Sequence, residues 1–206
     1  MANHYYSETQ ENLKSEPKNY IFNYHNHRFT YTSDSGVFSK NYIDFGSYTL
    51  IDSFKPSLDD EELLDVGCGY GPIGITLGIL YPSLKVTMID INERAIALAE
   101  KNIKDNKAQN VTVFKSNIYS NIEPDRKFFY ILTNPPIRAG KKVIYEIYDG
   151  AYKHLKENGE LWVVIQKKQG APSTISHLEE KFGNCEVVNK EKGYFILKSV
   201  YKGLDK

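Results

Sequence analysis

Short apolar runs alternate with helix-like stretches along most of this chain of 206 residues. Runs rich in β-branched and aromatic residues predict strands at 62–66, 85–89, 111–115, 128–133, 160–166, 185–189 and 194–200. The spacing of apolar residues predicts helices at 73–80, 93–106, 143–155 and 174–182. Such alternation indicates an α/β fold with a doubly wound, mostly parallel sheet, here of seven strands. Because only a short turn containing Gly193 joins the last two strands, we expect the last strand to be antiparallel.

The N-terminal part of the chain follows a different pattern. Residues 1–19 are polar and show no strong period, so we interpret them as a lead-in to a single domain over 20–206. Aromatic and β-branched residues over 20–32 flank His25-Asn26-His27, which predicts a small β-hairpin with both histidines exposed in its turn. A helix is expected over 44–51, despite Gly46.

Composition narrows the class of protein. A chain with 41% hydrophobic residues can bury one substantial core, and 26 basic residues balance 26 acidic ones, so only a local patch would attract a polyanion. Cys68 and Cys185 lack the spacing of disulfide frameworks or metal ligands, and the N-terminus lacks the pattern of a signal peptide. No apolar run approaches the roughly 20 residues of a membrane span. We therefore expect a soluble cytoplasmic protein without a metal site.

The first predicted strand of the sheet carries Asp65 near its carboxyl end and leads into a glycine-rich turn with Gly67, Gly69 and Gly71. Doubly wound sheets bind ligands at the carboxyl ends of their strands, and glycine lets the backbone approach a ligand closely. The second strand ends in Asp90, whose carboxylate can accept hydrogen bonds from a ribose diol. Asn117 follows the third strand, and its amide can pair with an adenine ring. Each acid alone is equally typical of a turn cap, but their order favours an adenosine-containing cofactor.

These residues together resemble the class I S-adenosylmethionine-dependent methyltransferases. The glycine loop, ribose-binding acid and adenine-facing residue of that family correspond to residues 65–71, Asp90 and Asn117. The resemblance implies a Rossmann-like sheet and S-adenosylmethionine as cofactor, with Ile91 and Ile118 also contacting it. Many relatives carry Asp where this chain has Asn117, a departure that removes a charge and keeps the acceptor oxygen.

A second loop, Asn134-Pro135-Pro136, follows the fourth strand of the series. An exocyclic amine on a base is a poor nucleophile because its lone pair is delocalised into the ring. The Asn134 side-chain oxygen and the Pro135 carbonyl can accept both amine hydrogens and turn the lone pair toward the methyl group, while the prolines fix the backbone. Asn134 would then adjoin both cofactor and substrate. Taken alone, Asn-Pro at a strand end is also typical of an ordinary turn.

Three further stretches narrow the resemblance: 33–40 with 44–47, then 137–141, then 166–173. With them the chain resembles the catalytic domain of the small-subunit (16S) ribosomal RNA guanine-N2 methyltransferases, in a single-domain version. The resemblance implies that Gly36, Val37 and Phe38 lie over the cofactor pocket and that guanine N2 in ribosomal RNA is the target. Ile137 stands where relatives carry an aromatic residue that stacks on the base.

Basic residues follow neighbouring strands and define what we call the basic rim: Arg138, Lys141, Lys142, Lys167 and Lys168. Loops after neighbouring parallel strands share one edge, so the rim can bind RNA phosphates, although solvated loops are often basic without binding anything. A flipped or single-stranded guanine is the expected form of the substrate. Two alternatives stay open: a protein-amide or small-molecule N-methyltransferase, and a noncatalytic RNA-binding accessory protein of the same fold.

Overall fold

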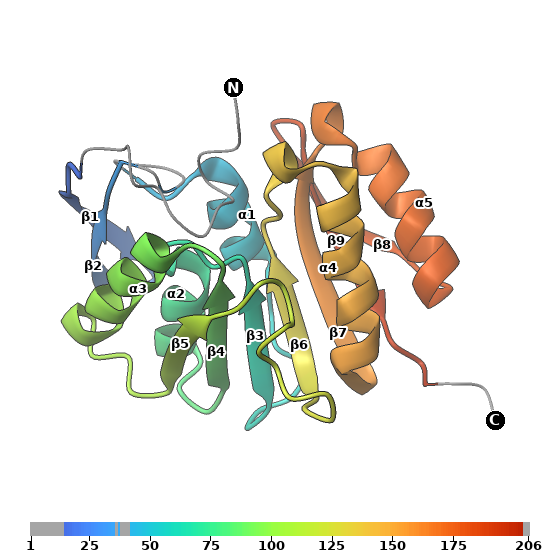
Figure 1. Cartoon of the computed structure of the whole chain (residues 1–206), viewed down its shortest axis with the longest axis horizontal. Coiled ribbons are helices and arrows are strands. Elements are labelled where there is room, and N and C mark those ends of the chain that lie inside the picture. The colour runs from blue at the N-terminus through green and yellow to red at the C-terminus, as the bar shows by residue number, and fades with distance from the viewer. Residues whose placement is uncertain (1–14, 36, 38–41, 204–206) are drawn as a thin grey trace.

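In the computed structural model, residues 15–35, 37 and 42–203 are described, and seven strands of this part form one sheet in the order β5-β4-β3-β6-β7-β9-β8 (Figure 1). The strands are β3 (Glu62–Val66), β4 (Lys85–Asp90), β5 (Val111–Lys115), β6 (Phe128–Thr133), β7 (Leu155–Gln166), β8 (Glu186–Glu191) and β9 (Tyr194–Val200). Strands β5, β4, β3, β6 and β7 pair in parallel, and β9 runs antiparallel to β7 and β8. The predicted doubly wound sheet with an antiparallel last strand is confirmed.

Helices cover both faces of the sheet because successive residues of a strand point to opposite sides. Leu63 packs in the cluster that includes α1 (Phe45–Ser53), α2 (Pro72–Leu80) and α3 (Glu93–Asp105). Its neighbour Leu64 packs in the cluster that includes α4 (Lys141–His154) and α5 (Ala171–Phe182). Both residues are fully buried, so the central strands are apolar on both faces, as parallel sheets require. No helix in the described ranges has the length and apolar character needed to cross a bilayer.

The predicted N-terminal hairpin consists of β1 (Lys18–Tyr24) and β2 (His27–Ser33), and Figure 1 shows it at the opposite side of the molecule from α5. Its turn contains His25 and Asn26, with φ of 44° and 61°, the left-handed conformation of tight hairpin turns. The sequence prediction placed His27 in the turn as well, which was wrong. His27 starts β2 because a turn of two residues is sufficient to join the strands.

Helix α3 holds the hairpin through two side-chain amides one turn apart. Asn102 accepts a hydrogen bond from the Thr32 N–H (2.8 Å) and donates to the Thr32 carbonyl (2.9 Å). Asn106 does the same at Thr30, at 2.9 and 2.8 Å. Thr30 and Thr32 point their backbone polar groups to the same edge of β2, so the two amides satisfy groups that a neighbouring strand would otherwise pair.

Several element boundaries differ from the sequence predictions. Strand β7 begins at Leu155, five residues before the predicted start, because the polar segment 156–159 belongs to an irregular part of the strand, with a register shift against β6. Asn158 in this segment donates its N–H to the Tyr201 carbonyl (2.7 Å), and the Tyr201 N–H donates to Gly159 (2.9 Å). Helices α4 and α5 begin at Lys141 and Ala171, directly after glycines, and not at residues 143 and 174 as the sequence predicted.

Candidate active site

A cavity of about 250 Å³ lies at the carboxyl ends of the parallel strands. Residues that follow β3, β4, β5 and β6 line it, together with the N-terminus of α1 and the first residue of β9. Because β9 is antiparallel, its beginning lies at the same edge as the ends of its neighbours, where Tyr194 pairs with Gln166 of β7. The cavity therefore occupies the edge at which the sequence predicted a ligand site.

The glycine-rich turn forms one wall. Gly67, Gly69 and Gly71 adopt φ of 74°, 57° and 92°, a region that other residues rarely enter. Gly67 and Gly69 line the cavity, and a Cβ on either would meet nothing within 4 Å. Gly71 has a different role, because it starts α2 and a Cβ there would lie 2.7 Å from the Ile75 Cδ1 atom. The first two glycines thus shape the cavity wall, and the third shapes the helix start.

Asp90 connects two of the cavity loops. Its Oδ2 atom accepts a hydrogen bond from the Gly69 N–H (2.8 Å), and its Oδ1 atom accepts one from the Asn92 N–H (2.9 Å). Burial raises the pKa of the Asp90 carboxyl above its ordinary value, although the hydrogen bonds from Asn92 and Gly69 oppose that shift. Asp90 and the following Ile91 both line the cavity. The carboxylate is therefore held in one orientation with its edge accessible from the cavity.

Asp65 lies elsewhere, outside the cavity lining. It is fully buried, and its Oδ2 atom accepts a hydrogen bond from the Gly74 N–H (3.0 Å) in the first turn of α2. Its Oδ1 atom has no hydrogen-bond partner among the described residues. Burial raises the pKa of Asp65 to about 7; the Gly74 hydrogen bond opposes this shift, and the nearby charge of Asp90 adds to it. This contact matches the alternative interpretation, in which Asp65 is a capping residue. It caps α2, the helix that follows the glycine turn.

The loop after β5 contributes Ser116 and Ile118 to the cavity, while Asn117 between them is exposed and outside the lining. The Asn117 N–H donates to the Ser120 Oγ atom (3.1 Å), and the Ser116 hydroxyl donates to the Ile118 carbonyl (2.8 Å). The predicted adenine contact of Asn117 therefore stays a prediction. Sequence reasoning missed Ser116, whose only signal was its place beside Asn117.

The loop after β6 places Asn134, Pro135 and Pro136 in the cavity wall. The Asn134 Nδ2 atom donates to the Asp44 Oδ1 atom (3.2 Å) and to the Ser47 Oγ atom (3.0 Å). Asp44 is the N-cap of α1 and also accepts the Ser47 N–H (3.0 Å). These contacts use the amide nitrogen of Asn134, so in this orientation its Oδ1 atom stays available as an acceptor. The sequence predicted a helix over 44–51, but it assigned neither Asp44 nor Ser47 to the site.

Two more cavity residues come from the end of the chain and escaped sequence reasoning. Tyr194 opens β9, and its ring packs on Phe45 with centroids 5.5 Å apart. Gly46 permits this approach, because a Cβ there would lie 2.9 Å from the Tyr194 Cε1 atom. Gln169 ends the short 3₁₀ helix η2 (Lys167–Gln169) and also lines the cavity. Tyr194 and Gln169 lie near the predicted cofactor loops because of the order and direction of β7 and β9 in the sheet. No local sequence pattern indicates that order.

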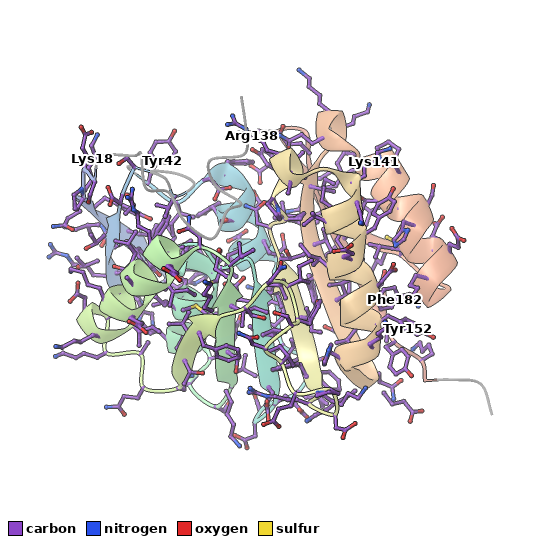
Figure 2. All side chains as sticks on the ribbon, viewed as in Figure 1. Lys18, Tyr42, Arg138, Lys141, Tyr152 and Phe182 are labelled. Atoms are coloured by element: carbon purple, nitrogen blue, oxygen red, sulfur yellow. The ribbon has the colours of Figure 1, made fainter. Side chains whose placement is uncertain are left out.

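Among the substrate residues predicted from sequence, Ile137 and Arg138 line the cavity, within the 3₁₀ helix η1 (Ile137–Ala139). The four lysines of the basic rim are exposed and lie outside the lining. Two of them, Lys141 and Lys142, were predicted in a loop; they form the first turn of α4 instead, because Gly140 starts that helix. Figure 2 shows Arg138 and Lys141 near the same upper edge of the molecule.

Of the predicted segment over the pocket, Val37 is buried and lines the cavity, and Gly36 and Phe38 lie outside the described residues. Cys68 also lines the cavity, and burial raises the pKa of its thiol well above the ordinary value, so it is not a ready nucleophile. Within the described ranges, no group of three or more His, Cys, Asp or Glu side chains is arranged to hold a metal ion.

The chain is similar in sequence to a known protein family and to several bacterial proteins. Residues 28–198 match the family model described as methyltransferase small domain. The uncharacterized protein YbxB of Bacillus subtilis (strain 168) is 51% identical over 199 residues, which cover 97% of this chain and 98% of that protein. The ribosomal RNA small subunit methyltransferase C of Photorhabdus laumondii is 32% identical over 202 residues, which cover 96% of this chain and 58% of that protein.

Among solved structures, the T. thermophilus 16S rRNA N2 methyltransferase RsmC, in complex with AdoMet and guanosine, superposes with a TM-score of 0.82 at 21% identity. The match covers 91% of this chain and 51% of that one, so this chain spans about half the length of the small-subunit enzymes that it matches. The structural likeness confirms the fold, and the sequence likeness confirms the resemblance to the small-subunit enzymes. The chain belongs to the methyltransferase small domain family.

Proposed function

We propose that this protein transfers a methyl group from S-adenosylmethionine to an exocyclic amine, and that the amine is N2 of a guanine in ribosomal RNA. The observation that carries the proposal is the orientation of Asn134, whose amide nitrogen is bound by Asp44 and Ser47. Its Oδ1 atom and the Pro135 carbonyl then provide two acceptors at one wall of the cavity. Two acceptors match the two hydrogens of a primary amine on a planar ring.

The cavity fits the adenosine part of the proposed cofactor. The Asp90 carboxylate accepts backbone hydrogen bonds from Gly69, Asn92 and Ile91, and two carboxylate oxygens offer about four acceptor positions, so capacity remains for a ribose hydroxyl. Gly67 and Gly69 leave open space where a side chain would otherwise project. Ile91 and Ile118 add apolar surface suited to the faces of an adenine ring. When bound, S-adenosylmethionine supplies an electrophilic methyl carbon whose bond to sulfur breaks as the bond to nitrogen forms.

The protein residues then act by orientation. Asn134 and Pro135 hold the two amine hydrogens, which turns the nitrogen lone pair out of the ring plane and toward the methyl carbon. The nitrogen becomes positively charged as it forms the new bond, and it loses one proton to water without a dedicated base. Correct placement of the reacting atoms can account for a large part of such a rate enhancement. Pro135 and Pro136 support that placement by restricting the backbone of the loop.

Two features favour RNA over a protein amide or a small metabolite. Arg138 lines the cavity, and the lysines of the basic rim follow the neighbouring parallel strands β6 and β7, whose carboxyl ends lie at the same edge of the sheet. Lys192 adds a further cation beside the site, with its Nζ atom 4.5 Å from the centre of the Phe45 ring. Tyr194 provides an aromatic surface in the cavity, which compensates for the aliphatic Ile137. Cations around an aromatic-lined pocket suit a flipped nucleotide and its phosphates.

The test is transfer of radiolabelled methyl groups from S-adenosylmethionine to four acceptors in parallel: naked ribosomal RNA, small subunits, large subunits and total cell protein. We expect label in ribosomal RNA, either naked or within the small subunit. Label confined to protein would replace the proposal with an amide methyltransferase. Binding of RNA without any transfer would favour the noncatalytic alternative.

A further inference from the structure

We propose that Asp44 and Ser47 are positioning residues that fix the side-chain amide of Asn134 in its productive orientation. The inference rests on the proposed function, because it assigns a purpose to the Asn134 Oδ1 atom. Asp44 and Ser47 both line the cavity and both accept hydrogen bonds from the Asn134 Nδ2 atom, at 3.2 and 3.0 Å. The three residues come from two segments 87 to 90 positions apart.

The chemistry of Asp44 sets the direction of the Asn134 amide. An ionised carboxylate only accepts hydrogen bonds, so it selects the NH₂ end of the amide and repels the oxygen end. A flipped Asn134 would place its oxygen against the Asp44 carboxylate and its NH₂ toward the substrate amine, which would remove the acceptor that the reaction needs. Hydrogen bonds to charged groups contribute enough to favour the observed orientation by roughly 10- to 100-fold.

Helix α1 holds Asp44 itself in place. The same Oδ1 atom that accepts from Asn134 caps α1 by accepting the Ser47 N–H (3.0 Å), and the Asp44 carbonyl accepts the Tyr48 N–H (2.9 Å). The helix is anchored by Leu50 and Ile51, which are buried in the core. Because α1 is packed in the core, its N-cap Asp44 has a fixed position, and its hydrogen bond fixes the side chain of Asn134 in the loop after β6.

Two alternative explanations for Asp44 compete with the positioning role. Asp44 could serve only as the N-cap of α1, or its negative charge could attract the sulfonium of the cofactor. The test uses Asp44→Ala, Asp44→Asn, Asn134→Asp and the double variant D44N/N134D. The matched control is Asp52→Ala, because Asp52 is exposed near the other end of α1 and its carboxylate accepts from the Tyr24 hydroxyl, away from the cavity. Cofactor affinity by calorimetry, thermal unfolding and kcat are measured for each variant.

We expect Asp44→Ala to lower kcat by roughly 10- to 100-fold while cofactor affinity stays within about twofold. Asn134→Asp should lose activity because two carboxylates then face each other. The double variant restores a donor and an acceptor with their positions exchanged, so it should recover at least about tenfold over Asn134→Asp. Additive losses in the double variant would overturn the proposal. A loss of cofactor affinity that accounts for the whole effect would assign Asp44 to the cofactor charge instead.

One readout does not depend on the substrate. The side-chain NH₂ resonances of Asn134 report its hydrogen bonds directly in the full-length protein. Asp44→Ala should shift these resonances and speed their exchange with solvent, and Asp52→Ala should leave them unchanged. Unchanged Asn134 resonances in Asp44→Ala would overturn the positioning role. If the wild type transfers no methyl group to any RNA, the proposed function fails, and the NMR result still decides the positioning role.

Discussion

Replacing Asp65 by Asn should flatten the dependence of stability on pH. Asp65 is fully buried with one unpaired oxygen, and its pKa of about 7 lies well above the ordinary value of 3.8. Between these two values the folded chain holds a proton that the unfolded chain has released. The free energy of unfolding therefore falls as the pH rises through this window, and the contribution of Asp65 is complete below about pH 4 and lost above about pH 7.

The size of the effect follows from the shift. Each pKa unit corresponds to about 1.4 kcal/mol, so two units between pH 5 and pH 7 amount to at most about 3 kcal/mol, which relaxation around the carboxyl reduces. Asn is neutral at every pH and keeps an acceptor for the Gly74 N–H. The Asn NH₂ group would take the place of the unpaired Asp65 Oδ1 atom, and any free-energy cost of burying it there is the same at every pH. The stability of Asp65→Asn relative to wild type should therefore increase by about 1–3 kcal/mol from pH 5 to pH 8.

The assay is urea unfolding followed by circular dichroism at pH 5, 6.5 and 8, without cofactor. Since Asp65 lies outside the cavity lining, the affinity for S-adenosylmethionine should change by less than about tenfold in this variant, below the effect of losing a hydrogen bond to a charged group. A constant stability difference across the three pH values would refute the reasoning, because Asp65 would then be ionised in the folded chain at pH 5. A large loss of cofactor affinity would return Asp65 to the cofactor site that the sequence suggested.

Three other predictions concern binding. Asp90→Ala should weaken S-adenosylmethionine binding by roughly 10- to 100-fold in calorimetry, because a charged acceptor for the ribose is lost; unchanged affinity would remove Asp90 from the site. Changing the lysines of the basic rim to Gln should flatten the salt dependence of RNA binding by roughly one unit of log–log slope per lost contact, whereas the control Lys85→Gln, at the other end of β4, should not. Tyr194→Ala should raise KM for RNA by roughly 10- to 100-fold through lost stacking, and Tyr194→Phe should behave like wild type; equal effects of both variants would contradict a stacking role.

The sequence predicted the sheet well because its strands carry their own signal. Val66, Leu64 and Leu132 belong to apolar runs that end in glycine or Asn, and such runs fit a buried parallel strand in this setting. The irregular start of β7 was missed because residues 156–159 are polar and contain Gly159, a pattern typical of a turn. Backbone hydrogen bonds with Tyr201 and the pairing of Leu155 with Phe128 hold that segment in the sheet.

The sequence predicted residues of the site that lie at the carboxyl ends of strands, and it missed several others. Asp90 ends β4 and Asn134 follows β6, so the rule for carboxyl ends of parallel strands placed them together. Asp44, Ser47 and Tyr194 have no such rule, because their proximity to Asn134 depends on how α1 packs and on which strand is antiparallel. Asp65 was grouped with the cavity because it comes just before the glycine turn, but it belongs to strand β3 and its side chain points to the face of the sheet that α2 covers, where it accepts the Gly74 N–H.

The central claim is that Asn134 orients a guanine amine for methyl transfer. Its most direct test is nucleoside mass spectrometry of ribosomal RNA and small subunits after reaction with S-adenosylmethionine carrying a deuterated methyl group, for wild type and Asn134→Ala. The account predicts deuterated N2-methylguanosine with wild type, and a rate about 10²-fold lower with Asn134→Ala at nearly unchanged cofactor affinity. Label at the wild-type rate in Asn134→Ala, or label on any atom other than an exocyclic amine, would contradict it.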